Sequence, residues 1–215
     1  MASSPGPSTP ILPASSALLT PSTFTTTTTT TSGPFQNFDF PPYTLFPPFY
    51  TLQPNLTTRA RQLDLWSTLV TSYHAHHHLF RLNLSTPPPD LFTSPTKARS
   101  LSPTNIRVLL DHLASTGKVE WIPAATKGEE SHAVWVWWRS AGEWADEVYG
   151  WVDGTGQKGS VLTVYELLEE EEGAVSGRNW VGMEDAMFRK VLGVLVKRGK
   201  AQVFGEADGG GVKFF

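Results

Sequence analysis

Residues Met183–Phe215 have the sequence MEDAMFRKVLGVLVKRGKAQVFGEADGGGVKFF, which carries the signals of one complete structural unit. Apolar residues recur at helical spacing in its first part, and Gly199 stands where a helix should stop. Two apolar stretches, Ala201–Phe204 and Val212–Phe215, flank a turn at Asp208–Gly211, as in a β-hairpin. The sequence therefore predicts helix, strand, turn and strand. The helical stripe is Met187, Val191, Leu192, Leu195 and Val196.

The same pattern occurs a second time, earlier in the chain. A shift of about 82 residues, a period long enough for a duplicated unit, places Ile106–Trp121 over Phe188–Val203. The earlier copy also ends in a predicted strand pair, Val119–Ile122 and Ala133–Trp138. A helix followed by a two-stranded wing, present twice, predicts an α+β fold, mainly α, that consists of two tandem winged-helix domains.

Composition and pattern divide the chain into four parts. Residues 1–38 are rich in Ser, Thr and Pro and carry no charged side chain, so we expect a disordered tail. This tail has neither the basic start and unbroken apolar core of a secretory signal nor the arginines of a mitochondrial one. A proline-aromatic segment follows at 39–55, and we expect the winged-helix domains at 56–139 and 140–215.

The overall composition excludes several classes of protein. The chain has no cysteine, so disulfides and thiolate metal sites are excluded and a reducing compartment is favoured. Its formal net charge of −3 argues against a surface that attracts polyanions generally. No run of about 20 apolar residues occurs, so no membrane-spanning helix is predicted.

The proline-aromatic segment contains FPPYTLFPPFYTLQP at Phe40–Pro54. Because proline fixes φ and biases the residue before it toward extended geometry, we predict an extended rather than helical segment. Its apolar surface should dock, either on its own first domain as a strap or in an apolar groove of another protein, and we favour the second. Under that interpretation, alanine at Phe49 and Tyr50 weakens assembly and leaves the monomer folded.

Amphipathic patterns place the remaining helices. A helix at Thr57–His78 and a second that begins after the cap Ser102 carry the apolar stripes of the first domain. In the second domain, a helix ends near Gly154, and Thr163 with Glu166 forms a capping box for the next one. The predicted buried residues are Leu63, Trp66, Leu69, Val70, Tyr73, Ile106, Leu109, Leu110, Leu113, Trp144, Val148, Trp151 and Val152.

Three tryptophans lie within the predicted strand Ala133–Trp138. No basic residue occurs among them before Arg139, so a platform that stacks nucleic-acid bases is not favoured. We predict that they pack between the domains or under a neighbouring helix.

No residue pattern predicts catalysis or a bound cofactor. His74 and His78 share a helix face at the spacing of a metal pair, but no glutamate follows His74 as in metalloproteases and no third ligand is evident. The glycine run at Asp208–Gly211 lies between strands, so it does not predict a phosphate site. No serine or carboxylate pair stands in a nucleophile motif. We therefore expect neither an enzyme nor a metal or cofactor site.

The alternative function is a DNA-binding winged-helix transcription regulator. The helix of the second domain has a basic face between Arg189 and Lys200, which could enter a major groove. Its counterpart in the first domain offers Arg107 but then Asp111, and phosphate neutralisation dominates affinity for DNA. Nucleic-acid binding is therefore not the expected function.

The chain from Phe40 to Phe215 resembles the vacuolar protein sorting-associated protein 25 family, the small winged-helix subunit of the endosomal sorting complex ESCRT-II. The motifs that carry the resemblance occur in the same order along the chain. They are FPPFYTLQPN at Phe46–Asn55, TGKVEW at Thr116–Trp121, Trp138-Arg139 followed by EW at Glu143-Trp144, SVLTVYEL at Ser160–Leu167, and GVKFF at Gly211–Phe215.

This resemblance implies tandem winged helices that bind protein, with two copies joining one copy each of two larger winged-helix subunits. The family's Pro-Pro-x-Tyr/Phe motifs insert into apolar pockets of those subunits. Tyr50 fits the aromatic place of one motif, whereas Thr44 stands where the upstream motif expects its aromatic, with Tyr43 before it. The candidate partner-binding residues are Pro41, Pro42, Tyr43, Phe46, Pro47, Pro48, Phe49 and Tyr50.

The resemblance also implies that the second winged helix, within Ser160–Phe215, recruits the nucleating subunit of ESCRT-III. The expected protein is a non-catalytic cytoplasmic adaptor, recruited to the endosome membrane through its complex. It would act in sorting ubiquitinated cargo into multivesicular bodies, without cofactor or nucleic acid.

Overall fold

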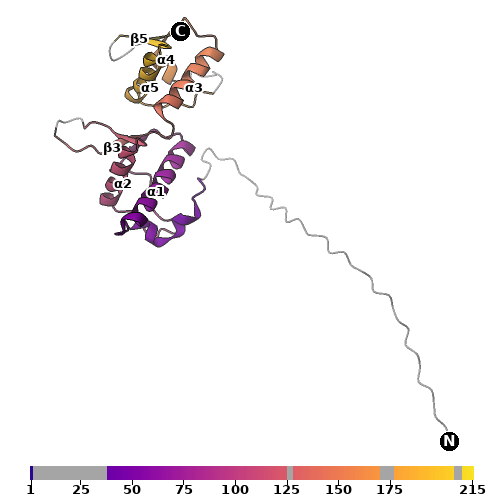
Figure 1. Cartoon of the computed structure of the whole chain (residues 1–215), viewed down its shortest axis with the longest axis vertical. Helices are drawn as coiled ribbons and strands as arrows, with labels where there is room; N and C mark the ends of the chain where they lie inside the picture. The colour runs from indigo at the N-terminus through magenta and orange to yellow at the C-terminus, as the bar shows by residue number, and fades with distance from the viewer. Residues whose placement is uncertain (2–37, 125–127, 170–176, 206–209) are drawn as a thin grey trace. The chain divides into compact units, whose positions relative to one another are not determined.

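The computed structural model describes residue 1 and residues 38–124, 128–169, 177–205 and 210–215. The predicted tail therefore lies outside the described residues except for Met1 and Phe38, and so do Asp208 and Gly209 of the predicted Asp208–Gly211 turn. Residues from Phe38 onward form one unit that contains both winged helices (Figure 1).

The first winged helix contains two long helices and one sheet. Its elements are α1 (Leu56–His76), β1 (Arg81–Asn83), α2 (Pro103–Ser115), β2 (Val119–Trp121) and β3 (Ala133–Val136). The strands are antiparallel in the order β1-β3-β2, with Leu82 and Trp121 both opposite Val134. The predicted helix cap is confirmed. The Ser102 hydroxyl accepts a hydrogen bond from Asn105 N at 3.3 Å, and Pro103 begins α2.

The second winged helix repeats this plan. Its elements are α3 (Ala141–Gly154), β4 (Val161–Thr163), α4 (Val164–Leu168), α5 (Asp185–Lys197), β5 (Ala201–Phe204) and β6 (Gly211–Phe214). The strand order β4-β6-β5 matches that of the first sheet, which confirms the predicted repeat. The capping box between Thr163 and Glu166 is present, and Gly199 adopts a φ of 68° just after α5, as a helix stop requires.

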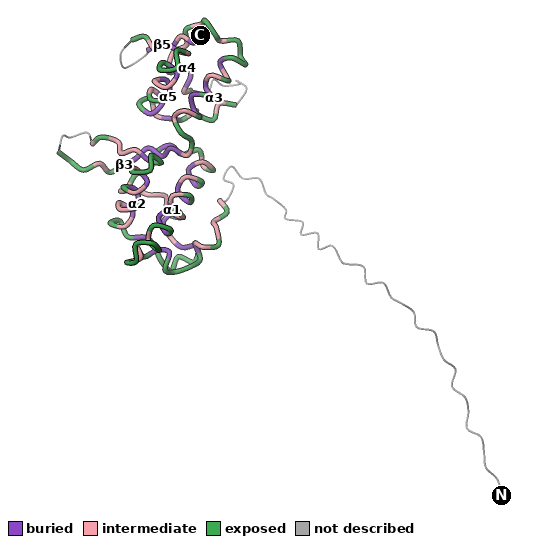
Figure 2. The backbone as a smooth tube through the Cα atoms, in the orientation of Figure 1, coloured by how far each residue is buried: buried purple, intermediate pink, exposed green. Residues whose placement is uncertain are grey.

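The apolar stripes form two cores, shown in purple in Figure 2. All but one of the predicted stripe residues in α1 to α3 are buried, Trp151 being half-buried. In α5 the stripe is narrower than predicted. Val196 is 42% exposed, so its assignment to the buried stripe was wrong, because Leu192 and Leu195 already fill the contact with the core.

The two winged helices differ between the first strand and the next helix. In the second domain, α4 fills this position. In the first domain, residues 84–102 contain no helix, and Thr93 and Ser100 form a single antiparallel bridge instead. None of the helices in the described parts of the chain is long and apolar enough to cross a membrane.

The proline-aromatic segment is not continuously extended, so that prediction was wrong. It forms two single 3₁₀ turns, η1 (Pro42–Leu45) and η2 (Pro47–Tyr50). Phe46, which precedes a proline, is extended with φ −83° and ψ 111°, as the proline rule requires. Each proline that opens a turn sits where its fixed φ is favourable and no backbone N–H is needed, so the turns form despite the proline content.

Candidate partner-binding site

The proline-aromatic segment packs on the first winged helix. Phe49 stacks on Trp66 of α1, with ring centroids 4.4 Å apart and planes 11° apart, and is only 5% exposed. Tyr50 is 4% exposed, and its hydroxyl donates to Thr44 O at 3.0 Å. Burial raises the pKa of the Tyr50 hydroxyl. The part of the segment around Phe49 and Tyr50 therefore packs on its own first domain, as the strap interpretation predicts.

Polar side chains of α1 fix the segment's backbone. Trp66 Nε1 donates to Phe49 O at 3.1 Å, and the buried amide of Gln62 donates to the same oxygen at 2.8 Å and to Thr51 O at 3.0 Å. Gln62 Oε1 in turn accepts from Gln53 N at 3.1 Å. Because buried polar groups are costly to leave unpaired, these bonds position η2 on α1 specifically.

The candidate residues divide between an inner and an outer face. Phe49, Tyr50 and the partly buried Tyr43 face the domain, and Tyr43 lies 5.1 Å from the Phe49 ring. Thr44, in the imperfect upstream motif, is fully buried. On the outer face, Phe46 is 62% exposed, and Pro42, Pro47 and Pro48 are also exposed, whereas Pro41 is half-buried.

Burial of Phe49 and Tyr50 contradicts the expectation that alanine at both positions leaves the monomer folded. Both rings belong to the core of the first winged helix, together with Trp66. The side chains of this segment that remain accessible to another protein therefore lie on its outer face.

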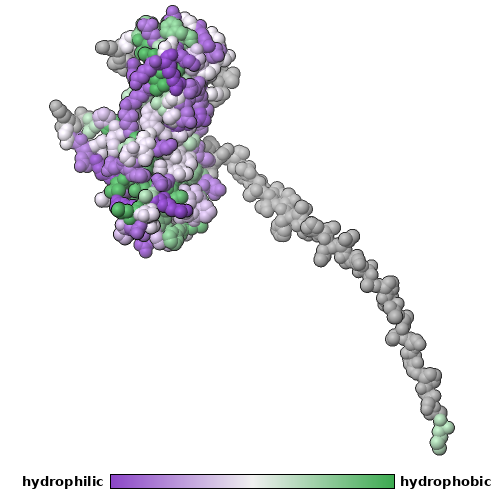
Figure 3. All heavy atoms as spheres, viewed as in Figure 1, coloured by the Kyte–Doolittle hydropathy of each residue, from purple (hydrophilic) through white to green (hydrophobic). Residues whose placement is uncertain are grey.

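The outer face borders an apolar groove of about 370 Å³. Phe46, Pro48 and Phe49 form one side of it, and Arg61 and Leu65 of α1 contribute to the other. Figure 3 shows hydrophobic residues gathered on the first domain at the end where Figure 1 draws the indigo segment. Leu65 lines the groove and was not among the predicted site residues. Leu45, next to Phe46 in the chain, was not predicted either and is 58% exposed. Leu65 is an apolar residue off the buried stripe of its helix, which was the available signal.

Trp135 of β3 joins the two winged helices together with Trp137 and Trp138, which follow this strand, as predicted. Trp135 and Trp137 are buried in the core of the second domain together with Phe80. Trp138 packs edge-on against Trp144 of α3, with centroids 4.6 Å apart, and stacks on Phe80 at 5.4 Å. The first domain thus contributes side chains to the core of the second.

Glu184 adds a polar link between the domains. Its two carboxylate oxygens accept from Arg81 Nη1 at 3.0 Å and from Trp135 Nε1 at 2.8 Å. Glu184 is the N-cap residue of α5, but its side chain makes no capping bond. The carboxylate therefore serves the domain interface rather than the helix end.

Two cations of α5 and its C-cap residue Arg198 pair with nearby acids. Lys190 pairs with Glu120 of β2, Arg198 Nη1 lies 2.6 Å from Asp146, and Arg189 Nε lies 2.6 Å from Asp185. A recognition helix needs cations that are available to phosphates. These pairings do not favour the DNA-binding alternative.

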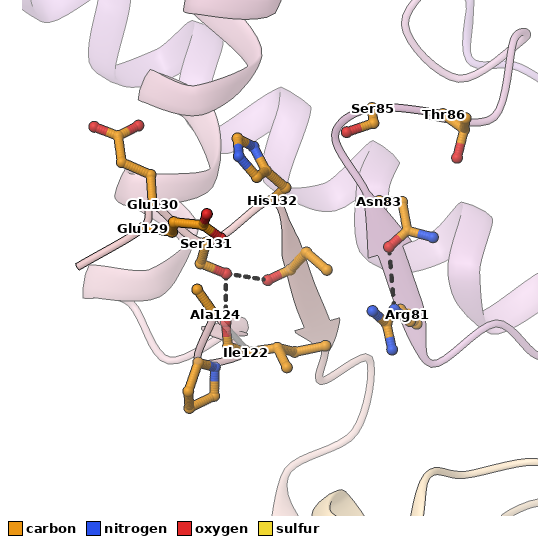
Figure 4. Close-up of a pocket in the computed structure, with 12 residues that line it drawn as sticks. Arg81, Asn83, Ser85, Thr86, Ile122, Ala124, Glu129, Glu130, Ser131 and His132 are labelled. Carbon is orange, nitrogen blue, oxygen red and sulfur yellow. Dashed lines mark hydrogen bonds between the residues drawn. The ribbon is translucent and has the colours of Figure 1, made fainter. Parts of the chain in front are cut away.

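A polar pocket of about 410 Å³ lies beside the first sheet (Figure 4). Glu130, Ser131 and His132 line it, and these residue types could act as a nucleophile with its base. The Ser131 hydroxyl donates instead to the backbone oxygens of Ile122 and, at 3.0 Å, of Ala133. Glu130 pairs with Arg107 at 3.2 Å. The serine hydroxyl therefore links the backbone at the ends of the two wing strands and has a structural role.

His74, of the candidate metal pair, is fully buried in the first domain. Its Nδ1 lies 2.7 Å from Val70 O, so in the neutral ring Nδ1–H donates to that carbonyl. Burial lowers the pKa of His74 to about 4, which means that the folded protein holds the neutral ring. Within the described residues, no three His, Asp or Glu side chains are grouped to hold a metal ion.

This histidine makes stability depend on pH. The unfolded chain binds the proton below pH about 6.5 whereas the folded chain does so only near pH 4, so stability is full above pH 6.5 and falls as the pH drops toward 4. We expect a loss of about 2 kcal/mol of unfolding free energy between pH 7 and pH 5, measured by urea denaturation. His74→Gln should flatten this dependence, while the exposed control His76→Gln should keep it. An equal pH dependence in His74→Gln would assign the effect to other groups.

A family model described as ESCRT-II complex subunit matches residues 43–184. The chain belongs to the ESCRT-II complex subunit family. Among the family's members, the vacuolar protein-sorting-associated protein 25 of Xenopus laevis is 35% identical over 179 residues, covering 83% of this chain and 99% of the relative. The human protein of that name is 34% identical over 180 residues, covering 83% and 98%.

Solved structures of ESCRT-II support the same assignment. The crystal structure of subunit VPS25 of the endosomal trafficking complex ESCRT-II matches with a TM-score of 0.69 and 25% identity, covering 80% of this chain and 97% of that one. A chain in the ESCRT-II complex of VPS22, VPS25 and VPS36 matches with a TM-score of 0.70 at 24% identity, which shows the shared fold. This ESCRT-II subunit therefore has the tandem winged-helix fold that the sequence predicts.

Proposed function

We propose that this chain is a non-catalytic adaptor subunit of ESCRT-II. It binds the larger ESCRT-II subunits through its proline-aromatic segment and the ESCRT-III nucleating subunit through its second winged helix. It acts from the cytoplasm on the endosome membrane, which it contacts through the complex, in sorting ubiquitinated cargo into multivesicular bodies. Membership of the ESCRT-II family supports this role.

The observation that carries the first contact is the exposed Phe46. An aromatic side chain that is 62% exposed beside an apolar groove is poorly accommodated in water. The fixed turns on either side hold it in place, so little conformational entropy is lost when a partner covers it. Phe46 and Leu45, rather than Phe49 and Tyr50, are therefore the anchors that we assign to the partner contact.

The test is binding of the full chain to the two larger ESCRT-II subunits, followed by native mass spectrometry and titration. Replacing Leu45 and Phe46 together with Ser should weaken binding at least tenfold, since buried aromatic anchors dominate such interfaces. The unfolding free energy should change by no more than about 0.5 kcal/mol, as expected for exposed positions.

The matched control is Phe204→Ser, which alters an exposed aromatic residue of the second domain. Normal assembly of the Leu45/Phe46 variant would refute the assigned contact. A salt-dependent shift of duplex DNA by the wild-type chain would instead favour the transcription regulator.

A further inference from the structure

Three serine or threonine residues in the described parts of the chain stand directly before a proline, namely Thr86, Ser94 and Ser102. Ser94 is 5% exposed, and its hydroxyl lies 2.9 Å from that of Thr96. The Ser102 hydroxyl caps α2 by accepting from Asn105 N. Thr86 differs from both, because it is exposed and its hydroxyl makes no hydrogen bond within the described residues.

The backbone at Thr86 has the form that protein kinases accept. These enzymes bind the residues around the acceptor hydroxyl in an extended conformation, and one class requires proline directly after the acceptor. Pro87 disfavours helical geometry at the residue before it, so Thr86 is biased toward extended backbone. The segment lies within residues 84–102, which contain no helix. Thr86 is therefore both chemically free and accessible.

The Thr86 side chain also borders a cation. Thr86 and Arg81 line the polar pocket beside the first sheet, and Figure 4 draws them on the same side of it. Arg81 carries the only guanidinium or ammonium group among the described residues that line this pocket. Its Nε donates to Asn83 Oδ1 at 3.1 Å and its Nη1 to Glu184 at 3.0 Å. A guanidinium has five N–H donors, so Arg81 has donors left for another anion.

The acids of the pocket lie away from Thr86. Figure 4 draws Glu129 and Glu130 on the opposite side, and Glu130 pairs with Arg107 at 3.2 Å. A phosphate on a threonine carries about −1.5 to −2 charges near neutral pH and three acceptor oxygens. Guanidinium groups bind such oxygens through short, charge-assisted hydrogen bonds. Attraction by Arg81 would therefore hold a phosphate on Thr86 at this side of the pocket.

We propose that Thr86 is a phosphorylation site for a proline-directed protein kinase and that its phosphate binds Arg81. Thr86 Oγ1 forms a bond to the γ-phosphorus of ATP, the bond from this phosphorus to the β,γ-bridging oxygen breaks, and ADP leaves. The hydroxyl proton passes to the catalytic aspartate of the kinase and then to solvent. Because Arg81 also bonds Glu184 of the second winged helix, the phosphate competes for the guanidinium and weakens this polar link between the domains.

The first test is phosphorylation of the full chain by a purified proline-directed kinase with ATP, mapped residue by residue by mass spectrometry. The controls are Ser94 and Ser102 in the same molecule. Thr86 should be modified at least about tenfold faster than either, since a buried or bonded hydroxyl requires local opening first. An unmodified Thr86, or equal rates at all three residues, would overturn the site.

The second test detects the contact between the phosphate and Arg81 by ³¹P NMR, with the signal assigned by its absence in Thr86→Val. The second pKa of this phosphate should be lower than in a peptide of the same local sequence, because a nearby cation favours the dianion. Arg81→Gln should restore the peptide value, whereas Arg99→Gln, which alters an exposed arginine outside the pocket, should not. An unshifted pKa in wild type would overturn the contact.

The third test follows the link between the domains. The Trp135 indole donates to Glu184 at 2.8 Å, so its N–H resonance reports on this carboxylate. Phosphorylation should shift the resonance in wild type and leave it unchanged in Arg81→Gln. The same resonance position before and after phosphorylation of wild type would show that the phosphate does not compete with Glu184.

Discussion

Replacing Phe49 with Ala should lower the free energy of unfolding of the first winged helix by about 3–5 kcal/mol. The ring is buried, stacks on Trp66 at 4.4 Å and borders the hydrogen bonds from Trp66 and Gln62 to its own carbonyl oxygen. Its removal leaves a cavity against a tryptophan that is itself fully buried, and η2 loses its apolar contact with α1. Urea denaturation followed by tryptophan fluorescence measures the effect.

Phe46→Ala is the matched control, because it removes the same side chain three positions earlier in the same segment. Phe46 is mainly exposed, so its unfolding free energy should stay within about 0.5 kcal/mol of wild type. A small change for both variants would mean that the segment is not part of the core. A large change for both would mean that Phe46 is buried in solution and is not available to a partner.

Replacing Trp144 with Ala should cost about 3–5 kcal/mol and should also affect how the two domains unfold together. Trp144 is fully buried in α3 and packs edge-on against Trp138 at 4.6 Å. Its ring also lies 5.9 Å from Phe80, which precedes the first strand of the first domain. The variant therefore removes an aromatic contact through which folding of one domain stabilises the folded state of the other.

We expect a single urea transition in wild type and two separate transitions in Trp144→Ala, with the second domain unfolding first. Fluorescence and far-UV circular dichroism should then no longer coincide, which is the standard test of two-state unfolding. Trp151→Ala is the control, because this half-buried residue of the same helix contacts Trp180 within its own domain. Coincident transitions in Trp144→Ala would show that the aromatic contact does not couple the domains.

The winged-helix plan could be predicted from the sequence because its determinants are local. Helical stripes, the caps at Ser102 and Thr163 and the stop at Gly199 each depend on residues a few positions apart, and each is present in the structure. The repeat then allowed the weaker first copy to be aligned with the clearer second one. Val196 was misplaced because periodicity alone does not define the width of a buried stripe.

The packing of the proline-aromatic segment could not be decided from its own residues. Both of its faces are apolar, and which face is buried depends on Trp66 and Gln62 of α1, well beyond the segment. The 3₁₀ turns were missed because the bias of residues that precede proline was extended to the whole segment.

The aromatic side chains shared between the two winged helices also limit where the chain can be cut into fragments and which parts can be exchanged with a homologue. Phe80, Trp135 and Trp137 come from the first winged helix in sequence but belong to the apolar core of the second. A fragment that ends before α3 would expose these side chains, and a fragment that begins at α3 would lose part of its interior. Replacing one winged helix by that of a homologue should therefore succeed only when Phe80, Trp135 and Trp137 are exchanged together with the second domain.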